Sequence, residues 1–463
     1  MRKNAQKNQL NVSKDLQNIQ EEYAQLFSDE VLDQLAKEHD FIKRKRKVTA
    51  ASFVNSLVFN LEDHKQFSLL DFKCDFFEAT GQHISREGLH KQFTVEAVNF
   101  LKDIFSRQLS AHLARQRKTI FDSCFFTGIY IKDSTKFNLS SSYFDSYPSC
   151  GGYSKGSAMM NIQYEFDLLS GNWKRLELTK ATRNDQTESK ETLDQICPGS
   201  LNIRDLGYIT TSYLKGIEVN NAYYLNRLPK VGVYQLVKGK HQKFDWKALG
   251  GRMKKQKFKY LELDVYLGKK EKLKTRMVVA PVPQNVVDDR IRKAKKGGKR
   301  TNGYQLSQEY KFKAQYNIMI TNVPKEVLSA QEVIEAYKLR WQVELVFKTW
   351  KSHLAIDQVK PMKKERMECQ LIAKFIWILL NTKLFQAANT LLKKLHPNKG
   401  CSFPKFFKRA KKFSPTLRGK INSLTAFLDW FDKSLIPIIP DLFIEQKSKK
   451  KTHCQSLYEI FNA

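Results

Sequence analysis

One segment of the sequence, EAYKLRWQVELVFKTWKSHL, spaces five polar residues so that a single helix would bring them together. At 3.6 residues per turn, one narrow stripe of that helix holds Tyr337, Arg340, Glu344, Lys348 and Lys351. Apolar residues occupy the opposite side, so the helix would bury one face and present one carboxylate, one aromatic ring and three cations on the other. An ordinary solvated face, supported by a Glu344–Lys348 pair, is the alternative interpretation.

A carboxylate among cations is suited to phosphoryl transfer. Mg²⁺ is usually held by one or two carboxylates together with phosphate oxygens, and two-metal sites collect acids from separate elements. Two aspartates end predicted strands: Asp133 follows Ile129–Lys132, and Asp205 follows Leu201–Arg204. We therefore predict that these two aspartates and Glu344 converge, although either aspartate alone would more simply be a turn or cap residue.

Two other aspartates have simpler explanations. Asp167 precedes Ser170 and Gly171, which predicts a turn. Asp185, in the sequence Asn184-Asp185-Gln186, is predicted to cap the following helix.

The first 120 residues have mainly helical patterns. Thr49 is placed to cap a helix, and Ser68–Thr80, Gly81 and Ser85–Phe93 follow in the order helix, glycine turn, serine-capped helix. That order is typical of a helix-turn-helix, and an ordinary helical hairpin explains it equally well. In the first case the second helix would present Arg86, His90 and Lys91.

Residues 124–228 change to a mixed pattern, predicted as β-β-β-α-β-α-β, which fits a ribonuclease-H-like sheet among other α/β folds. Residues 229–314 hold short β-like stretches between lysine-rich turns, and Arg290–Arg300 is predicted to be a flexible basic loop. A strand at Tyr316–Thr321 and one long helix from Ala330 to about Ala355 follow, and the last hundred residues are helical and basic.

The chain has 463 residues and a formal net charge of +33, which implies a polyanionic partner, with nucleic acid ahead of an acidic membrane surface. Residues 229–320 carry 24 basic and 7 acidic residues, so about half of the surplus lies in a fifth of the chain. No apolar run approaches the roughly 20 residues of a membrane span. Seven scattered cysteines without a CxxC pair argue against disulfides and zinc, so we expect a soluble cytoplasmic protein.

These motifs together resemble the transposases of the insertion-sequence-four family. Tyr337-x2-Arg340-x3-Glu344-x6-Lys351 matches the family's Tyr-Arg-Glu-Lys signature with every spacing intact. Asp133-Ser134-Thr135 resembles the first acidic motif and Arg204–Tyr208 the second. The resemblance extends to about Arg366 and is closest to the branch found in Bacillus-type insertion elements.

The resemblance implies an α/β fold: a ribonuclease-H-like catalytic core interrupted by a mostly β insertion domain, with helical N-terminal and C-terminal regions. The implied divisions are residues 1–118 (helical and DNA-binding), 119–228 (core, first part), 229–314 (basic insertion), 315–370 (core, second part) and 371–463 (basic helical region).

The same resemblance implies a DDE transposase that cuts double-stranded DNA at insertion-element ends and joins the ends to target DNA, in a homodimer on DNA. Asp133, Asp205 and Glu344 would hold two Mg²⁺ ions, for which Mn²⁺ substitutes. Tyr337, Arg340 and Lys351 would contact the DNA end, while the family assigns no role to Lys348. Relatives cut through a hairpin intermediate with a base-stacking tryptophan, for which this insertion offers Trp246 and, near its end, Tyr316.

Two other functions fit part of the pattern. A structure-selective nuclease would use the same core without strand transfer. A non-catalytic DNA-binding protein, such as a domesticated transposase, would need no acidic triad.

Overall fold

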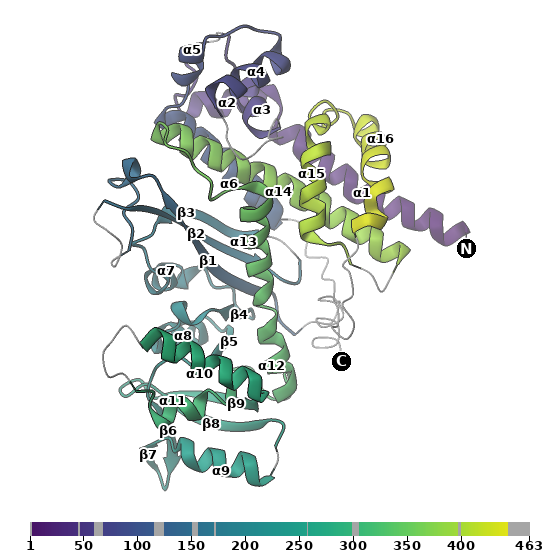
Figure 1. Ribbon diagram of the computed structural model, residues 1–463. Helices are drawn as coiled ribbons and strands as arrows, with labels where there is room; N and C mark the ends of the chain where they lie inside the picture. Colours follow the sequence, from purple (N-terminus) through teal and green to yellow (C-terminus); the bar gives the residue numbers. More distant parts are fainter. Residues whose placement is uncertain are drawn as a thin grey trace.

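The structure is a computed structural model, and it describes residues 2–44, 47–59, 68–114, 125–150, 156–170, 173–256, 258–298, 305–396 and 400–442. Its described part is a mixed α/β protein built around one ten-stranded sheet. Figure 1 shows helices from both ends of the chain packed together beyond one end of the sheet, and the segment around residues 233–313 at the other end. Helices α12 (Ala330–Lys338) and α13 (Trp341–Leu354) run along the sheet between these two parts.

The strand order of the sheet is β3-β2-β1-β4-β5-β10-β9-β8-β6-β7. Its first five strands in the sequence are β1 (Ile129–Leu139), β2 (Ala158–Asp167), β3 (Trp173–Lys180), β4 (Leu201–Arg204) and β5 (Tyr223–Arg227). β1, β2 and β3 pair antiparallel, whereas β4 is parallel to both β1 and β5. With α7 (Asp185–Glu191) before β4 and α8 (Thr211–Val219) before β5, the predicted β-β-β-α-β-α-β order is confirmed.

The prediction that Asp133 ends its strand was wrong, because pairing with β2 continues β1 to Leu139, whereas Asp205 directly follows β4 as predicted. Lys132 of β1 is paired with Arg204 of β4, and Ile203 of β4 is paired with Leu225 of β5. The residues that follow in the same register are Asp133, Asp205 and Arg227. Because side chains alternate between the two faces of a strand, these three residues share one face and lie in a row.

Residues 229–314 extend the same sheet. Four strands add to it through β10 (Tyr316–Thr321): β6 (Val233–Val237), β7 (Lys240–Lys243), β8 (Leu261–Leu267) and β9 (Leu273–Pro281). The segment also contains α9 (Trp246–Gln256), α10 (Gln284–Gly298) and α11 (Gln308–Lys313). More of its described residues are helical than extended, so the prediction of a mostly β segment was wrong.

The basic stretch predicted as a flexible loop is helical as far as Gly298, and its last two residues lie outside the described chain. Arg290 anchors this helix, because its Nη1 donates hydrogen bonds to the carbonyls of Ala314 and Tyr316 at 3.1 and 2.8 Å. Buried Val287 packs on the inner side of the same helix. Tertiary contacts therefore order a segment whose composition alone favours a loop.

Both ends of the chain contribute helices to one hydrophobic core with the sheet. The N-terminal helices are α1 (Arg2–Leu26), α2 (Asp29–Glu38), α3 (Ala50–Val58), α4 (Leu69–Thr80), α5 (Arg86–His90) and α6 (Val95–Ala114). The C-terminal helices are α14 (Lys364–Leu395), α15 (Phe403–Leu417) and α16 (Leu424–Ser434). The predicted boundary between residues 370 and 371 lies inside α14.

Among the described residues, only α14 is long and apolar enough to cross a membrane by composition, and 89% of its most apolar window is buried inside the protein. Its neighbours include α1 and α6, and Tyr23 of α1 donates its hydroxyl hydrogen to the carbonyl of Leu380 at 2.5 Å. These contacts are those of a core helix.

The predicted order of helix, glycine turn and serine-capped helix is present in α4 and α5. Gly81 ends α4 with a φ of 67°, a left-handed conformation that glycine adopts without strain. Ser85 caps α5 by accepting a hydrogen bond from the backbone N–H of Gly88 at 3.0 Å. α5 has only five residues, shorter than the predicted Ser85–Phe93, and Arg86 and Lys91 are exposed at its two ends.

The long helix predicted from Ala330 to about Ala355 is two helices. Ser329 starts α12 with a capping box, and α13 begins at Trp341. Between them the backbone N–H groups of Leu339 and Arg340 donate to carbonyls three residues earlier, a tighter turn than that of an α-helix. The break therefore falls at Arg340, within the predicted polar stripe.

Candidate active site

Asp133 and Asp205 form the centre of the site. They follow paired positions on adjacent parallel strands, and 16% of the Asp133 side chain is exposed. Burial raises the pKa of Asp133 to about 6, the Ser134 backbone N–H and Arg340 oppose this, and the negative charges of Asp205 and Asp185 add to it. Asp133 is therefore a carboxyl in a crowded acidic environment, a setting common at functional sites.

Arg340 connects Glu344 to this acidic pair. Its Nη1 donates to Asp133 Oδ2 at 2.7 Å and its Nη2 donates to Glu344 Oε1 at 2.7 Å. One planar guanidinium thus bridges a strand and a helix, with Arg340 and Asp133 207 positions apart in the sequence. The structure places Asp133 beside Asp205 and links Asp133 to Glu344 through Arg340.

The donor set is compatible with a hard divalent cation, because three carboxylates supply oxygen ligands of the kind Mg²⁺ prefers. As the side chains stand, no three acidic, histidine or cysteine residues of the described chain form a group close enough to hold a metal. The Arg340 guanidinium lies between Asp133 and Glu344 and supplies the positive charge that these carboxylates require. Arg340 therefore competes with a metal ion for the same carboxylates.

Tyr337 lies beside this group and is buried, with 5% of its surface exposed. Burial raises the pKa of its hydroxyl, while the cations Arg227 and Arg340 lower it. Among the described residues, its buried Oη has no hydrogen-bond partner. An unpaired buried hydroxyl costs free energy unless a ligand satisfies it.

Arg227 is a functional candidate that the sequence analysis missed. It ends β5 in register with Asp205, is exposed, and lies with its guanidinium carbon 5.5 Å from the centre of the Tyr337 ring. Asn226, next to it, donates to the Arg204 carbonyl at 2.9 Å and ties the ends of β5 and β4 together. The feature that could have identified Arg227 is its position at the end of a third parallel strand.

The two lysines of the predicted stripe have different environments. Lys351 is partly buried and donates from Nζ to the carbonyl of Lys136 on β1 at 3.1 Å. Lys348 is exposed. The stripe therefore does not present all five side chains as one surface: Tyr337 is buried under Arg227, Arg340 and Glu344 face Asp133, and Lys351 contacts the sheet.

Neither of the two candidate aromatics for base stacking is exposed. Trp246 is 8% exposed and Tyr316 is 5% exposed, and both belong to the core of the 229–314 segment. An exposed aromatic ring is found instead at Trp341, next to Arg340 in the chain, with 56% of its surface accessible.

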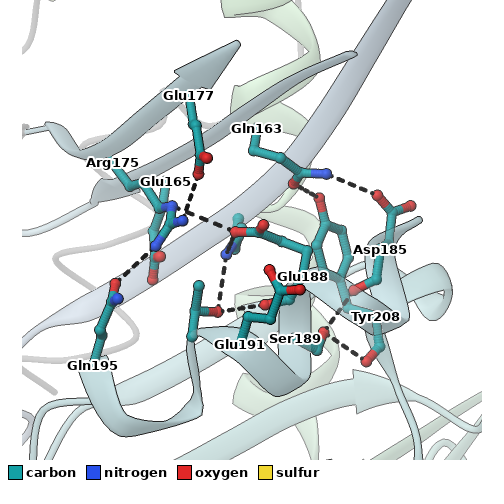
Figure 2. Close-up of polar contacts among 12 residues, drawn as sticks. Gln163, Glu165, Arg175, Glu177, Asp185, Glu188, Ser189, Glu191, Gln195 and Tyr208 are labelled. Atoms are coloured by element: carbon teal, nitrogen blue, oxygen red, sulfur yellow. Dashed lines mark hydrogen bonds and ion pairs between the residues drawn. The ribbon is translucent and has the colours of Figure 1, made fainter. Parts of the chain in front are cut away.

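A buried polar cluster lies on the other face of the sheet. Lys132 and Arg204, which directly precede the two aspartates, are 1% and 2% exposed. Glu188 accepts from Lys132 at 2.5 Å, and Glu165 accepts from Arg204 at 2.7 Å. Figure 2 shows Glu188 and Arg175 among the polar contacts of this cluster.

The structure confirms the prediction for Asp167 and contradicts the prediction for Asp185. Asp167 is a turn residue as predicted, because its Oδ1 accepts from the N–H of Leu169 at 3.1 Å. Asp185 does not cap α7; Asn184 does, by accepting from Thr187 N–H at 2.8 Å. The Asp185 carboxylate instead accepts from the Ser134 hydroxyl at 3.0 Å.

Comparison with known proteins agrees with this arrangement. Residues 125–380 match the family model described as the transposase DDE domain. The chain is 32% identical over 83% of its length to the transposase of insertion element IS231F from Bacillus thuringiensis subsp. israelensis, of which 83% is covered. It is 30% identical to that of IS231B from B. thuringiensis subsp. berliner, with 83% of each chain covered. It is 25% identical to that of IS1151 from Clostridium perfringens, with 82% of this chain and 83% of the relative covered.

The match covers more than half of the chain and includes all three predicted acids. Members of this family cut and join DNA, and their DDE domain generally uses divalent metal ions. The chain belongs to the DDE transposases of insertion sequences.

Proposed function

We propose that this protein cleaves DNA at the ends of an insertion element and transfers the freed 3′ ends into target DNA, using Asp133, Asp205 and Glu344 as metal ligands. The observation that carries the proposal is the row of Asp133 and Asp205 on adjacent strands, with Glu344 linked to it through Arg340. The strand order β3-β2-β1-β4-β5 supports a ribonuclease-H-like core for this chemistry.

The three carboxylates would hold two Mg²⁺ ions, with Mn²⁺ able to substitute; when bound, such ions activate the attacking water and stabilise the leaving 3′ oxygen. Arg340 forms a planar pair with carboxylates here, and a phosphate accepts the same forked hydrogen bonds. Its proposed role is to exchange a carboxylate for a DNA phosphate. Arg227 would contact a phosphate beside it, and the buried Tyr337 hydroxyl would find its partner on the bound DNA end.

Lys351 and Lys348 would supply point charges toward the DNA backbone, Lys348 from an exposed position. The freed 3′-OH first attacks the phosphodiester of the opposite strand, forming a hairpin and expelling the 3′ oxygen of the flanking DNA; water then hydrolyses the hairpin and regenerates the 3′-OH for transfer, and Trp341 offers the exposed ring for base stacking. We further propose that residues 1–118 bind element ends, that the 229–314 and 371–463 regions hold DNA backbone, and that a homodimer pairs the two ends.

The test uses the full chain, Mg²⁺ and a DNA fragment that carries the element's terminal inverted repeats with flanking DNA. We expect nicking at the repeat boundary that EDTA abolishes, and joining of pre-cleaved ends to a target plasmid. Cleavage without joining would support the structure-selective nuclease. Specific binding without cleavage would support a non-catalytic DNA-binding protein.

A further inference from the structure

Helix α7 contacts the chain on both sides of Asp133 and just after Asp205. Side-chain alternation along β1 directs Lys132 and Ser134 to the face opposite Asp133. α7 lies on that opposite face, where Figure 2 shows Asp185, Glu188 and Ser189 directed toward the strands and toward Tyr208. Asp133 itself faces α13, because its cross-strand partner Tyr164 packs on Trp350 at a ring distance of 4.9 Å.

The first contact holds the residue before Asp133. Glu188 is fully buried, and its Oε1 accepts from Lys132 Nζ at 2.5 Å. Thr192, at the end of α7, accepts from the same ammonium at 3.2 Å. The Lys132 side chain is thereby fixed to both the helix and its end.

The second contact holds the residue after Asp133. Asp185 Oδ1 accepts from the Ser134 hydroxyl at 3.0 Å. The backbone N–H of Ser134 in turn donates to Asp133 Oδ1 at 2.8 Å. Asp185 thus orients, through one residue, the carboxylate that would bind metal.

The third contact reaches the segment after Asp205. Ser189 Oγ lies 2.9 Å from the Tyr208 carbonyl. The Tyr208 hydroxyl donates to Gln163 Oε1 at 2.6 Å, and Gln163 Nε2 donates to Asp185 Oδ1 at 3.2 Å. A Cβ atom at Gly207 would lie 2.8 Å from Asp185 Oδ2, so a side chain there would displace the Asp185 carboxylate.

We propose that Asp185 is a positioning residue of the active site: through Ser134 on one side and the Gln163–Tyr208 pair on the other, it sets the relative placement of the Asp133 and Asp205 carboxylates. This inference rests on the proposed function of those two residues as metal ligands. Residues that orient metal ligands affect metal affinity strongly, since the loss of one typically lowers affinity or activity about 10–100-fold.

The experiment titrates the full-length protein with Mn²⁺ and follows the free ion by electron paramagnetic resonance, without DNA or turnover. Asp185→Ala removes the accepted hydrogen bonds, and we expect it to weaken Mn²⁺ binding about tenfold or more. Asp185→Asn retains a carbonyl oxygen in the same place, and we expect it to restore most of the affinity. Glu191→Gln, on the exposed side of the same helix, is the matched control and is expected to bind Mn²⁺ like the natural chain.

The outcomes separate the two proposals. If Asp133→Asn retains full Mn²⁺ binding, the proposed metal site is wrong. If Asp133→Asn loses binding but Asp185→Ala does not, only the positioning role is wrong. An equal loss in Asp185→Asn and Asp185→Ala would also overturn positioning, because it would indicate that the Asp185 charge itself binds the metal. Thermal unfolding of each variant shows whether the protein remains folded.

Discussion

Arg340 donates a hydrogen bond to Asp133 at 2.7 Å, and their side chains are only 14% and 16% exposed. The signature residue expected to bind DNA phosphate is thus paired with a carboxylate expected to bind metal. Removing one member of a largely buried pair leaves the other charge uncompensated. The pair therefore links the affinity of this site for cations to the position of one arginine.

Glu344→Gln is expected to lower DNA cleavage by at least about a hundredfold, because electrostatic stabilisation of the transition state is lost. Binding to the element's ends should stay close to that of the natural chain, because the amide still accepts from Arg340. A nicking assay and a gel-shift assay on the same DNA measure the two effects. Glu335→Gln on α12, where the carboxylate accepts from Gln331 at 3.1 Å, is the control. Full Mg²⁺-dependent nicking by Glu344→Gln would remove Glu344 from the active site.

Arg340→Ala is expected to reduce the slope of log affinity against log salt by about one, the signature of one lost phosphate contact. The measurement is a salt titration of binding to pre-cleaved ends. Arg340→Lys keeps the charge but not the forked geometry, so it should restore the slope without restoring full cleavage. An unchanged slope in Arg340→Ala would show that this guanidinium stays with Asp133 and Glu344 when DNA binds.

Arg227→Ala is expected to weaken binding of cleaved DNA ends and to reduce the salt slope by about one. The reason is its exposed position in register with Asp205 and over the Tyr337 ring. Arg292→Ala is the comparison, because Arg292 is 78% exposed on α10 and pairs with Asp289. If both variants lose affinity equally, Arg227 contributes only general positive charge.

Glu165→Gln is expected to lower the free energy of unfolding at pH 7 by about 3–5 kcal/mol, since it breaks a buried pair. Burial alone would raise the pKa of Glu165, but Arg204, Lys174 and Lys132 hold it at about 2, below the ordinary value of 4.5. A depressed folded-state pKa contributes stability above the unfolded value and loses it as pH falls toward 2.

Urea unfolding of the natural chain and Glu165→Gln from pH 7 to pH 3 measures this effect. The difference between the two proteins should be constant above about pH 5 and should narrow below it. Glu191→Gln, whose partner Arg183 lies at a partly exposed position, should differ little from the natural chain at any pH. A difference between the natural chain and Glu165→Gln that is independent of pH would mean that the Glu165 charge contributes no stability.

Local chemistry in the sequence determined much of this protein. Thr49 and Ser85 cap helices as predicted, since each cap uses a hydrogen bond from a backbone N–H three residues later. The position of Asp205 at the end of β4 and the Tyr-Arg-Glu-Lys spacing likewise depend on a few neighbouring residues.

Only the tertiary structure decided how these parts meet. The pairing of Arg340 with Asp133, the row that adds Arg227, and the reach of Asp185 to Ser134 all depend on strand register and on contacts between distant segments. Helix α10, which contains Arg290, and the break before Trp341 likewise depend on tertiary contacts. Helix propensity and hydrophobic periodicity do not predict such contacts. Burial makes these pairings matter, because a buried charge without a partner costs free energy.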